Sequence, residues 1–159
     1  MRVVVTEPVH PDALALLRDA GCTLLGPALE PADAVLVRLH PLAADALAHV
    51  RMVAKHGVGV DNIDVAAARA LGVVVANTPG ANADAVAEQA LMLMLMLALA
   101  RDLDGQREGR RGAVRGLEGR RLFLVGFGAS AGRVAKLAAA FGMAVSAWTP
   151  SGRALGVPR

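Results

Sequence analysis

The 159-residue sequence predicts an α/β protein with a parallel sheet, on three observations. Strand and helix signals alternate along the chain, which is typical of parallel strands joined by right-handed helical crossovers. Hydrophobic residues make up 55% of the chain, and Ala, Val and Leu dominate them, which suits buried parallel strands and their covering helices. Near the C-terminal end, a glycine-rich turn joins an apolar strand to a helix.

The expected strands of the first part are short apolar or β-branched runs. They are Arg2–Thr6, Cys22–Leu25, Ala34–Arg38, Met52–Lys55 and Val73–Ala76. Such runs, separated by helical patterns, indicate strands of a parallel sheet.

Three helices are expected between these strands. The first begins at Pro11, because proline fits the first turn of a helix, and it ends before Gly21. The second covers Pro41–His49. The third covers Val65–Leu71, and the preceding Asp64 is expected to cap it.

A turn and a long helix follow the fifth strand. Pro79 and Gly80 favour a type II turn, since proline fits its first central position and glycine its second. The helix is expected over Asp84–Asp102 and contains the apolar run Ala90–Ala100. That run would rise only about 16 Å, about half of a bilayer core, so we interpret it as a buried helix and expect no membrane partner.

The composition changes abruptly to Gly and Arg over Gly105–Gly119, which we interpret as a linker. The expected domains are therefore residues 1–104 and 120–159, with 105–119 between them. Net charge is only +3, and the arginines of the linker are not interleaved with aromatic residues. We therefore expect a solvated segment and no nucleic-acid partner.

Cysteine usage and the start of the chain indicate the compartment. The single cysteine, Cys22, excludes an internal disulfide and fits a reducing, cytoplasmic location. Met1-Arg2 leads directly into Val3–Val5, which is too short for a secretory apolar region. We assign no metal ligands.

The glycine-rich turn lies between an expected strand, Leu122–Val125, and an expected helix, Ser130–Phe141. This context is that of the dinucleotide-binding fingerprint, in which a first glycine makes the turn and a second admits a pyrophosphate. The expected cofactor-binding residues of this turn are Gly126, Gly128, Ala129, Ser130 and Ala131. A strand, turn and helix without a ligand would show the same pattern.

The end of the next strand bears on the choice of cofactor. In NAD-binding proteins an acidic residue about 20 positions after the fingerprint holds the ribose 2′-hydroxyl. Thr149 stands at the strand end, no Asp or Glu follows Glu118, and Ser151 and Arg153 lie just beyond. A hydroxyl and a guanidinium suit a 2′-phosphate, so NADP is favoured over NAD. Arg153 is equally well explained as a solvated residue.

A second candidate site is the segment from Lys55 to Asp64, in which glycines flank Val58. Glycines at the end of a strand leave backbone N–H groups open, and such a nest binds carboxylate or phosphate. A plain strand-to-helix loop with Asp64 as a cap explains the same residues.

The sequence resembles the D-isomer-specific 2-hydroxyacid dehydrogenases, in particular phosphoglycerate dehydrogenase-like members. The resemblance rests on Val-Ala-Lys-His-Gly-Val-Gly-Val-Asp-Asn-Ile-Asp (53–64), Ala-Asn-Thr-Pro-Gly (76–80), Val-Ala-Glu (86–88) and Val-Gly-Phe-Gly…Ala-Phe-Gly-Met (125–143). It implies a flavodoxin-like, parallel-sheet substrate domain followed by the first β-α-β unit of a Rossmann domain. It also implies a homodimer for the complete enzyme.

The resemblance implies a substrate and its binding residues. The substrate would be a small 2-hydroxy or 2-keto acid, oxidised or reduced with NAD or NADP. Its carboxylate would lie on Val58 and Gly59, and Arg38 would contact it. The ribose-binding position falls on Thr149. The catalytic arginine, glutamate and histidine of the family are expected after residue 159, so no catalytic residue is assigned here.

The four histidines, His10, His40, His49 and His56, match none of the family's motifs. We expect them to be surface, turn or cap residues. An alternative function is a non-catalytic nucleotide-binding or interaction module that keeps the fold without the chemistry.

Overall fold

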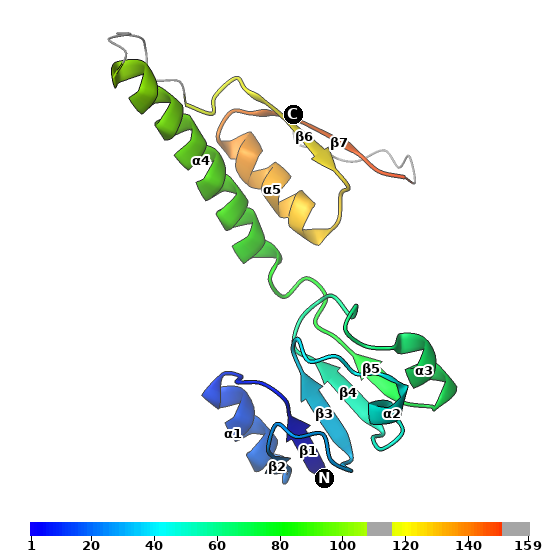
Figure 1. The fold of residues 1–159 in the computed structure, drawn as a ribbon. Coiled ribbons are helices and arrows are strands. Elements are labelled where there is room, and N and C mark those ends of the chain that lie inside the picture. Colours follow the sequence, from blue (N-terminus) through cyan, green and yellow to red (C-terminus); the bar gives the residue numbers. More distant parts are fainter. Residues whose placement is uncertain (108–115, 151–159) are drawn as a thin grey trace. The chain divides into compact units, whose positions relative to one another are not determined.

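The structure is a computed structural model that describes residues 1–107 and 116–150, with only the backbone for 102–107. The chain divides into two compact units, Met1–Ala81 and Asn82–Arg159. Each is an α/β unit with parallel strands, which confirms the predicted fold class (Figure 1).

The first unit contains a five-stranded sheet in the order β2-β1-β3-β4-β5. Its strands are β1 (Arg2–Val5), β2 (Thr23–Leu25), β3 (Ala34–Val37), β4 (Met52–Lys55) and β5 (Val74–Ala76). All neighbouring strands are parallel. This strand order is the flavodoxin-like one, in which the sheet grows in both directions from the first strand and leaves a topological switch point between β1 and β3.

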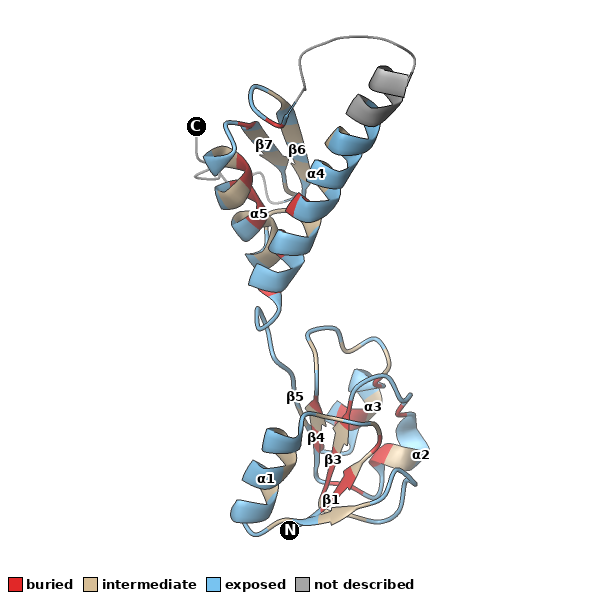
Figure 2. Ribbon diagram, turned by 90° about the vertical axis from the view of Figure 1, so that its left-hand side faces the viewer, coloured by how far each residue is buried: buried red, intermediate tan, exposed pale blue. Residues whose placement is uncertain are grey.

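Helices cover both faces of this sheet. Helix α1 (Pro11–Asp19) lies on one face, and α2 (Ala44–Leu47) and α3 (Val65–Ala70) lie on the other (Figures 1 and 2). The core between sheet and helices is aliphatic. Its buried members include Val4, Val35, Val37, Leu42, Leu47, Val53 and Ile63.

Two local predictions in this unit are confirmed. The Asp64 carboxylate accepts a hydrogen bond from the Ala67 N–H at 2.8 Å and so caps α3. The Ala81 N–H donates to the Thr78 carbonyl at 3.3 Å. With Gly80 at φ +77° between them, this is the type II turn expected at Pro79-Gly80.

Helix α2 is shorter than the predicted Pro41–His49. Leu42 is instead extended and forms a parallel bridge with Ile63. Its N–H donates to the Asn62 carbonyl at 2.8 Å, and its carbonyl accepts from the Asp64 N–H at 2.9 Å. These backbone groups are therefore occupied by a distant segment, and the helix begins only after them.

The second unit contains α4 (Ala83–Arg107), β6 (Arg121–Val125), α5 (Ala129–Ala140) and β7 (Ala144–Trp148). Strands β6 and β7 form a two-stranded parallel sheet. Helix α5 packs against α4, and an ion pair of 2.9 Å joins Arg133 Nε to Asp84 Oδ1. Leu91, Leu117, Ala138 and Met143 form a buried core cluster. Over Ala83–Arg101, most of the surface of α4 is exposed (Figure 2).

The long helix continues beyond the predicted end at Asp102 to Arg107. The predicted linker therefore begins inside a helix, because one glycine in a helix costs only about 1 kcal/mol and does not end it. Residues 108–115 of that linker lie outside the described residues. The compact units meet at Ala81–Asn82, whereas the composition placed the boundary after residue 104. The functional domains 1–104, 105–119 and 120–159 remain a prediction.

Helix α4 is more extensive than the apolar run from which it was predicted. Ala83–Arg101 is 19 residues long and contains an 18-residue stretch with a mean hydropathy of 1.6, of which 17% is buried. The helix is therefore mostly exposed in the structure, and the expectation of a buried helix is wrong. By length and composition alone it could cross a membrane. Core helices of soluble proteins meet the same criteria, so the helix does not assign the chain to a membrane.

Candidate functional site

The first candidate site lies at the carboxyl ends of the sheet strands in the first unit. A pocket of about 290 Å³ opens there, and its walls come from the start of α1 and from the ends of β3, β4 and β5. It is lined by Val9, His10, Ala13, Leu36, Ala54, Lys55, His56, Ala76, Asn77 and Thr78. Ligands of open parallel sheets bind at this edge, near the switch point.

The loop after β4 carries the predicted nest. Gly57 adopts φ +143°, a conformation that other residues rarely adopt. Asn77 Nδ2 donates to the Val58 carbonyl at 2.7 Å, and the Thr78 N–H donates to the Gly57 carbonyl at 3.0 Å. Among the described residues, the N–H groups of Val58 and Gly59 have no hydrogen-bond acceptor. Two donors are therefore open for an anion.

The turn after β3 carries Arg38, and Glu7 holds it. The Glu7 carboxylate accepts hydrogen bonds from the N–H groups of Arg38 at 2.8 Å, Leu39 at 2.5 Å and His40 at 2.6 Å. Partial burial opposes ionisation of Glu7, but hydrogen bonds from the Thr6 hydroxyl and from these three N–H groups lower its pKa from 4.5 to about 2. The carboxylate therefore spans the switch point from β1 to β3.

Lys55 approaches the same turn from β4. Its side chain is buried, with 8% exposed, and its ammonium donates to the Arg38 carbonyl and, at 2.5 Å, to Asn62 Oδ1. Asn62 in turn donates through Nδ2 to the His40 carbonyl at 2.7 Å. In the part of the chain that the structure describes, no carboxylate lies within ion-pair distance of Lys55.

None of the predicted substrate residues Arg38, Val58 and Gly59 lines this pocket, but two of them contact residues that do. Lys55, which lines it, contacts Arg38, and Asn77, which also lines it, contacts Val58. Glu7 was not singled out from the sequence, whereas Lys55, Asn62 and Asn77 lay within the quoted segments without a role of their own. The sequence holds a signal for each of the two charged residues: Lys55 ends an otherwise apolar strand, and Glu7 directly follows the predicted strand Arg2–Thr6.

The described histidines occupy turns and helix ends. His10 caps α1, since its Nδ1 accepts from the Asp12 N–H at 3.3 Å, which confirms the expected cap role at this position. The side chains of His40, His49 and His56 are exposed. Within the described ranges, no group of three His, Cys, Asp or Glu residues is placed to hold a metal ion.

The second candidate site is the turn between β6 and α5. Gly126 adopts φ +92°, which favours glycine, and Gly128 immediately precedes the helix. A Cβ added to Gly128 would meet nothing within 4 Å, so there is open space beside the backbone. Helix geometry leaves the N–H groups of Ala129, Ser130 and Ala131 without intrahelical acceptors. These residues fit the pyrophosphate of a nicotinamide dinucleotide.

The residues expected to meet the ribose are described only in part. Thr149 directly follows β7 and is partly buried. Arg153 lies outside the described residues. The pairing of β6 with β7 places Thr149 beside the glycine turn, because the Gly126 N–H donates to the carbonyl of the preceding residue, Trp148, at 2.7 Å.

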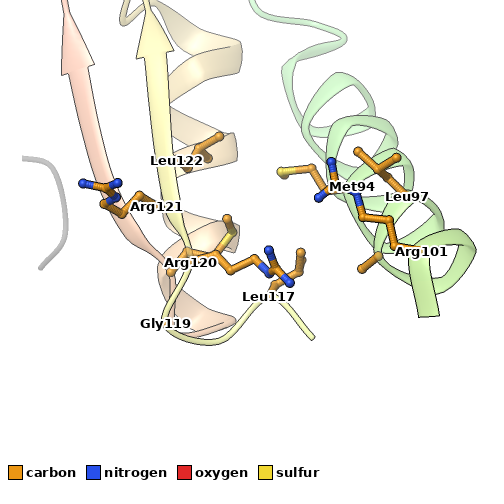
Figure 3. Close-up of a pocket in the computed structure, with 10 residues that line it drawn as sticks. Met94, Leu97, Arg101, Leu117, Gly119, Arg120, Arg121 and Leu122 are labelled. Atoms are coloured by element: carbon orange, nitrogen blue, oxygen red, sulfur yellow. The ribbon is translucent and has the colours of Figure 1, made fainter. Parts of the chain in front are cut away.

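A further pocket of about 430 Å³ in the second unit lies at the other end of β6 (Figure 3). Its walls combine apolar side chains of α4, such as Met94 and Leu97, with arginines near the start of β6. Arg120 is fixed by a hydrogen bond of 2.9 Å from its Nε to the Gly116 carbonyl. None of the residues predicted to bind substrate or cofactor lines this pocket.

Comparison with known proteins identifies the family. Residues 3–155 match the D-isomer specific 2-hydroxyacid dehydrogenase, catalytic domain. The chain belongs to this family. It is 43% identical over 109 residues to a hydroxypyruvate reductase of Thermotoga maritima, covering 65% of this chain and 36% of that protein. It is 32% identical to a D-3-phosphoglycerate dehydrogenase of Methanocaldococcus jannaschii, covering 94% of this chain and 32% of that protein.

Solved structures show the same fold. The TT0316 protein from Thermus thermophilus has a TM-score of 0.81 and 31% identity, covering 99% of this chain and 59% of that one. A glyoxylate/hydroxypyruvate reductase of Sinorhizobium meliloti, described as NADPH-dependent, has a TM-score of 0.77 and 28% identity. The match covers 98% of this chain and 56% of that one. A 3-phosphoglycerate dehydrogenase of Entamoeba histolytica with bound NAD+ has a TM-score of 0.68 and 27% identity. The match covers 97% of this chain and 55% of that one. The chain spans about a third of the length of the curated relatives that it matches.

Proposed function

We propose that this chain supplies the carboxylate-binding part and the first pyrophosphate-binding unit of an NAD(P)-dependent 2-hydroxyacid dehydrogenase. The observation that carries the proposal is the pair of open N–H groups at Val58 and Gly59, at the carboxyl edge of the sheet. A 2-hydroxy or 2-keto acid would place its carboxylate there, and the Arg38 guanidinium would bind it from the neighbouring turn.

In the second unit, the turn at Gly126 and Gly128 would admit the pyrophosphate, with Ala129, Ser130 and Ala131 at the helix N-terminus. When bound, the nicotinamide cofactor accepts or donates a hydride at C2 of the acid. This chain's own residues bind and orient the two ligands. The acid-base and carbonyl-polarising groups would come from further residues of the complete enzyme, for which we propose a homodimer in the cytoplasm.

We further propose that the chain prefers NADP to NAD. The support is Thr149, which occupies the position of the acidic residue of NAD-binding proteins. That acidic residue would repel a 2′-phosphate, whereas Thr149 would not, and Arg153 lies nearby in the sequence. The similar solved structures include both an NAD+ complex and an NADPH-dependent enzyme. The choice between NAD and NADP must therefore be argued from the residues of this chain.

Cofactor titration tests this part of the proposal. Trp148 ends β7 with 54% of its surface exposed, so its fluorescence should fall as reduced cofactor binds nearby. NADPH should bind more tightly than NADH, Thr149→Asp should reverse the order, and Gly128→Asp should abolish binding of both. An NADH preference in the unmodified chain would refute the NADP assignment, and unchanged binding by Gly128→Asp would refute the site.

The alternative function is a non-catalytic nucleotide-binding or interaction module. The gene sequence after codon 159 distinguishes it from the dehydrogenase. Sequence after codon 159 that encodes the family's arginine, glutamate and histidine would support the dehydrogenase. Unrelated sequence there would support the module.

A further inference from the structure

One peptide group in the first unit is held at both ends by charged side chains. Its carbonyl, from Arg38, accepts a hydrogen bond from the Lys55 ammonium. Its N–H, from Leu39, donates to Glu7 Oε1 at 2.5 Å. Hydrogen bonds to charged groups are stronger than neutral ones. The peptide between Arg38 and Leu39 is therefore clamped between a cation and an anion.

Neighbouring backbone groups extend this clamp along the turn. Glu7 also accepts from the N–H groups of Arg38 and His40, and Asn62 links the His40 carbonyl to Lys55. Polar groups of the turn from Arg38 to His40 are thus satisfied by three side chains from three other parts of the first unit. A displacement of this turn would therefore break charge-assisted hydrogen bonds.

Lys55 connects this turn with the anion-binding loop. A Cβ added to Gly57 would lie 3.5 Å from Lys55 Cε, so the lysine stem runs beside the loop that carries Val58 and Gly59. An ammonium has three donors, and two acceptors are identified here, Arg38 and Asn62. Lys55 also lines the pocket. Burying an ammonium without a carboxylate partner costs free energy, which a bound anion would offset.

We propose that Glu7 and Lys55 are positioning residues that fix the Arg38 turn and thereby place the Arg38 guanidinium against the carboxylate of a 2-hydroxy or 2-keto acid. This rests on the proposed function of the same site. The backbone of the turn fixes the position from which the long, exposed Arg38 side chain extends. A small displacement of a binding group strongly weakens its contact with a ligand. Lys55 adds positive potential between the two carboxylate-binding elements.

The effect of Glu7→Gln separates positioning from simple electrostatics. Removing a negative charge near an anion site should strengthen anion binding if only charge matters. Glutamine has one acceptor oxygen where the carboxylate has two, so it cannot hold all three N–H groups of the turn. If positioning matters, Glu7→Gln therefore weakens anion binding although it makes the site more positive.

The test uses the full ¹⁵N-labelled chain, with oxalate as the probe at constant ionic strength. Two amide signals of the loop, Val58 and Gly59, report binding, and hydrogen exchange at Leu39 and His40 reports the clamp without any ligand. Glu7→Gln should speed exchange at both turn amides and weaken oxalate binding about threefold or more.

Lys55→Met should weaken oxalate binding about fivefold to tenfold, because it removes both the clamp and the charge. Glu30→Gln and Arg18→Met remove one negative and one positive charge, respectively, from exposed positions elsewhere in the first unit. The first should leave oxalate binding unchanged or slightly tighter, and the second should weaken it less than twofold. Urea midpoints of all four variants show whether each variant remains folded.

The results of these experiments test the clamp, the positioning role and the proposed carboxylate-binding function separately. Unchanged exchange at Leu39 and His40 in Glu7→Gln would overturn the clamp. Oxalate binding as tight as in the unmodified chain, or tighter, would overturn the positioning role. If the unmodified chain shows no response at Val58 and Gly59, the proposed function fails and the substrate role with it, while the exchange result still decides whether the clamp exists.

Discussion

Glu7 should make the stability of the first unit depend on pH, and Glu7→Gln should remove this dependence. The pKa of Glu7 is lowered from 4.5 to about 2 in the folded chain. Between these values the unfolded chain binds more protons than the folded one. The contribution of Glu7 is therefore complete above pH 4.5 and is lost as the pH falls towards about 2.

The magnitude follows from the same pKa values. The difference between 4.5 and about 2 corresponds to at most about 3 kcal/mol of unfolding free energy at pH 7. Glu7 is only partly buried, and solvent screens its interactions, so we expect about 1–2 kcal/mol. Glu7→Gln should lower stability by that amount at pH 7 and by almost nothing near pH 2.

The assay must report on the first unit alone. Urea unfolding followed through the methyl NMR signals of Val53 and Leu47 does so, because both side chains are fully buried in its core. Fluorescence of Trp148 would report on the second unit. Glu30, whose carboxylate lies 3.4 Å from Arg2 Nη2 at the surface, provides the matched control, since exposed pairs contribute little. An equal loss of stability in Glu7→Gln at pH 7 and pH 2.5 would refute the reasoning.

Two further predictions concern packing. Leu47→Ala should destabilise the first unit by about 2–4 kcal/mol, because Leu47 is fully buried, whereas Leu71→Ala at a half-exposed site should cost well under half as much; urea unfolding of both variants checks this. Light scattering should show self-association of the chain that Val125→Lys reduces, because Phe123 and Val125 are 62% and 77% exposed on β6. Leu16→Lys, at an exposed position of α1, should leave the scattering unchanged, and equal effects of the two lysines would contradict the assignment to β6.

The parts of the fold that depend on neighbouring residues could be predicted from the sequence. Asp64 caps the helix that follows it, and Pro79-Gly80 forms its type II turn, because both features need only a few consecutive residues. Helix α2 was predicted too long because Leu42 pairs with Ile63, a partner that local propensity cannot indicate.

The candidate site shows the same division. The glycines of both loops carry a local signal, since Gly57 and Gly126 adopt φ values that other residues rarely adopt. The clamp around Arg38 joins Glu7 after β1 to Lys55 at the end of β4, and only the strand order brings them together. The sequence shows a charged residue at the end of an apolar strand, but it does not show which residue that charge would contact.

The hydrogen bonds that Asn77 and Thr78 donate to the loop after β4 have a consequence for selectivity. They engage the carbonyls of Val58 and Gly57 and leave the N–H groups of Val58 and Gly59 open. The loop therefore offers hydrogen-bond donors to a ligand. An ammonium group needs acceptors, and the Val58 and Gly57 carbonyls already accept hydrogen bonds. A receptor of this kind distinguishes ligands by the sign of their charge before their shape. Sulfate or phosphate from a buffer should compete for it, so assays of hydroxy-acid binding belong in buffers without small polyvalent anions.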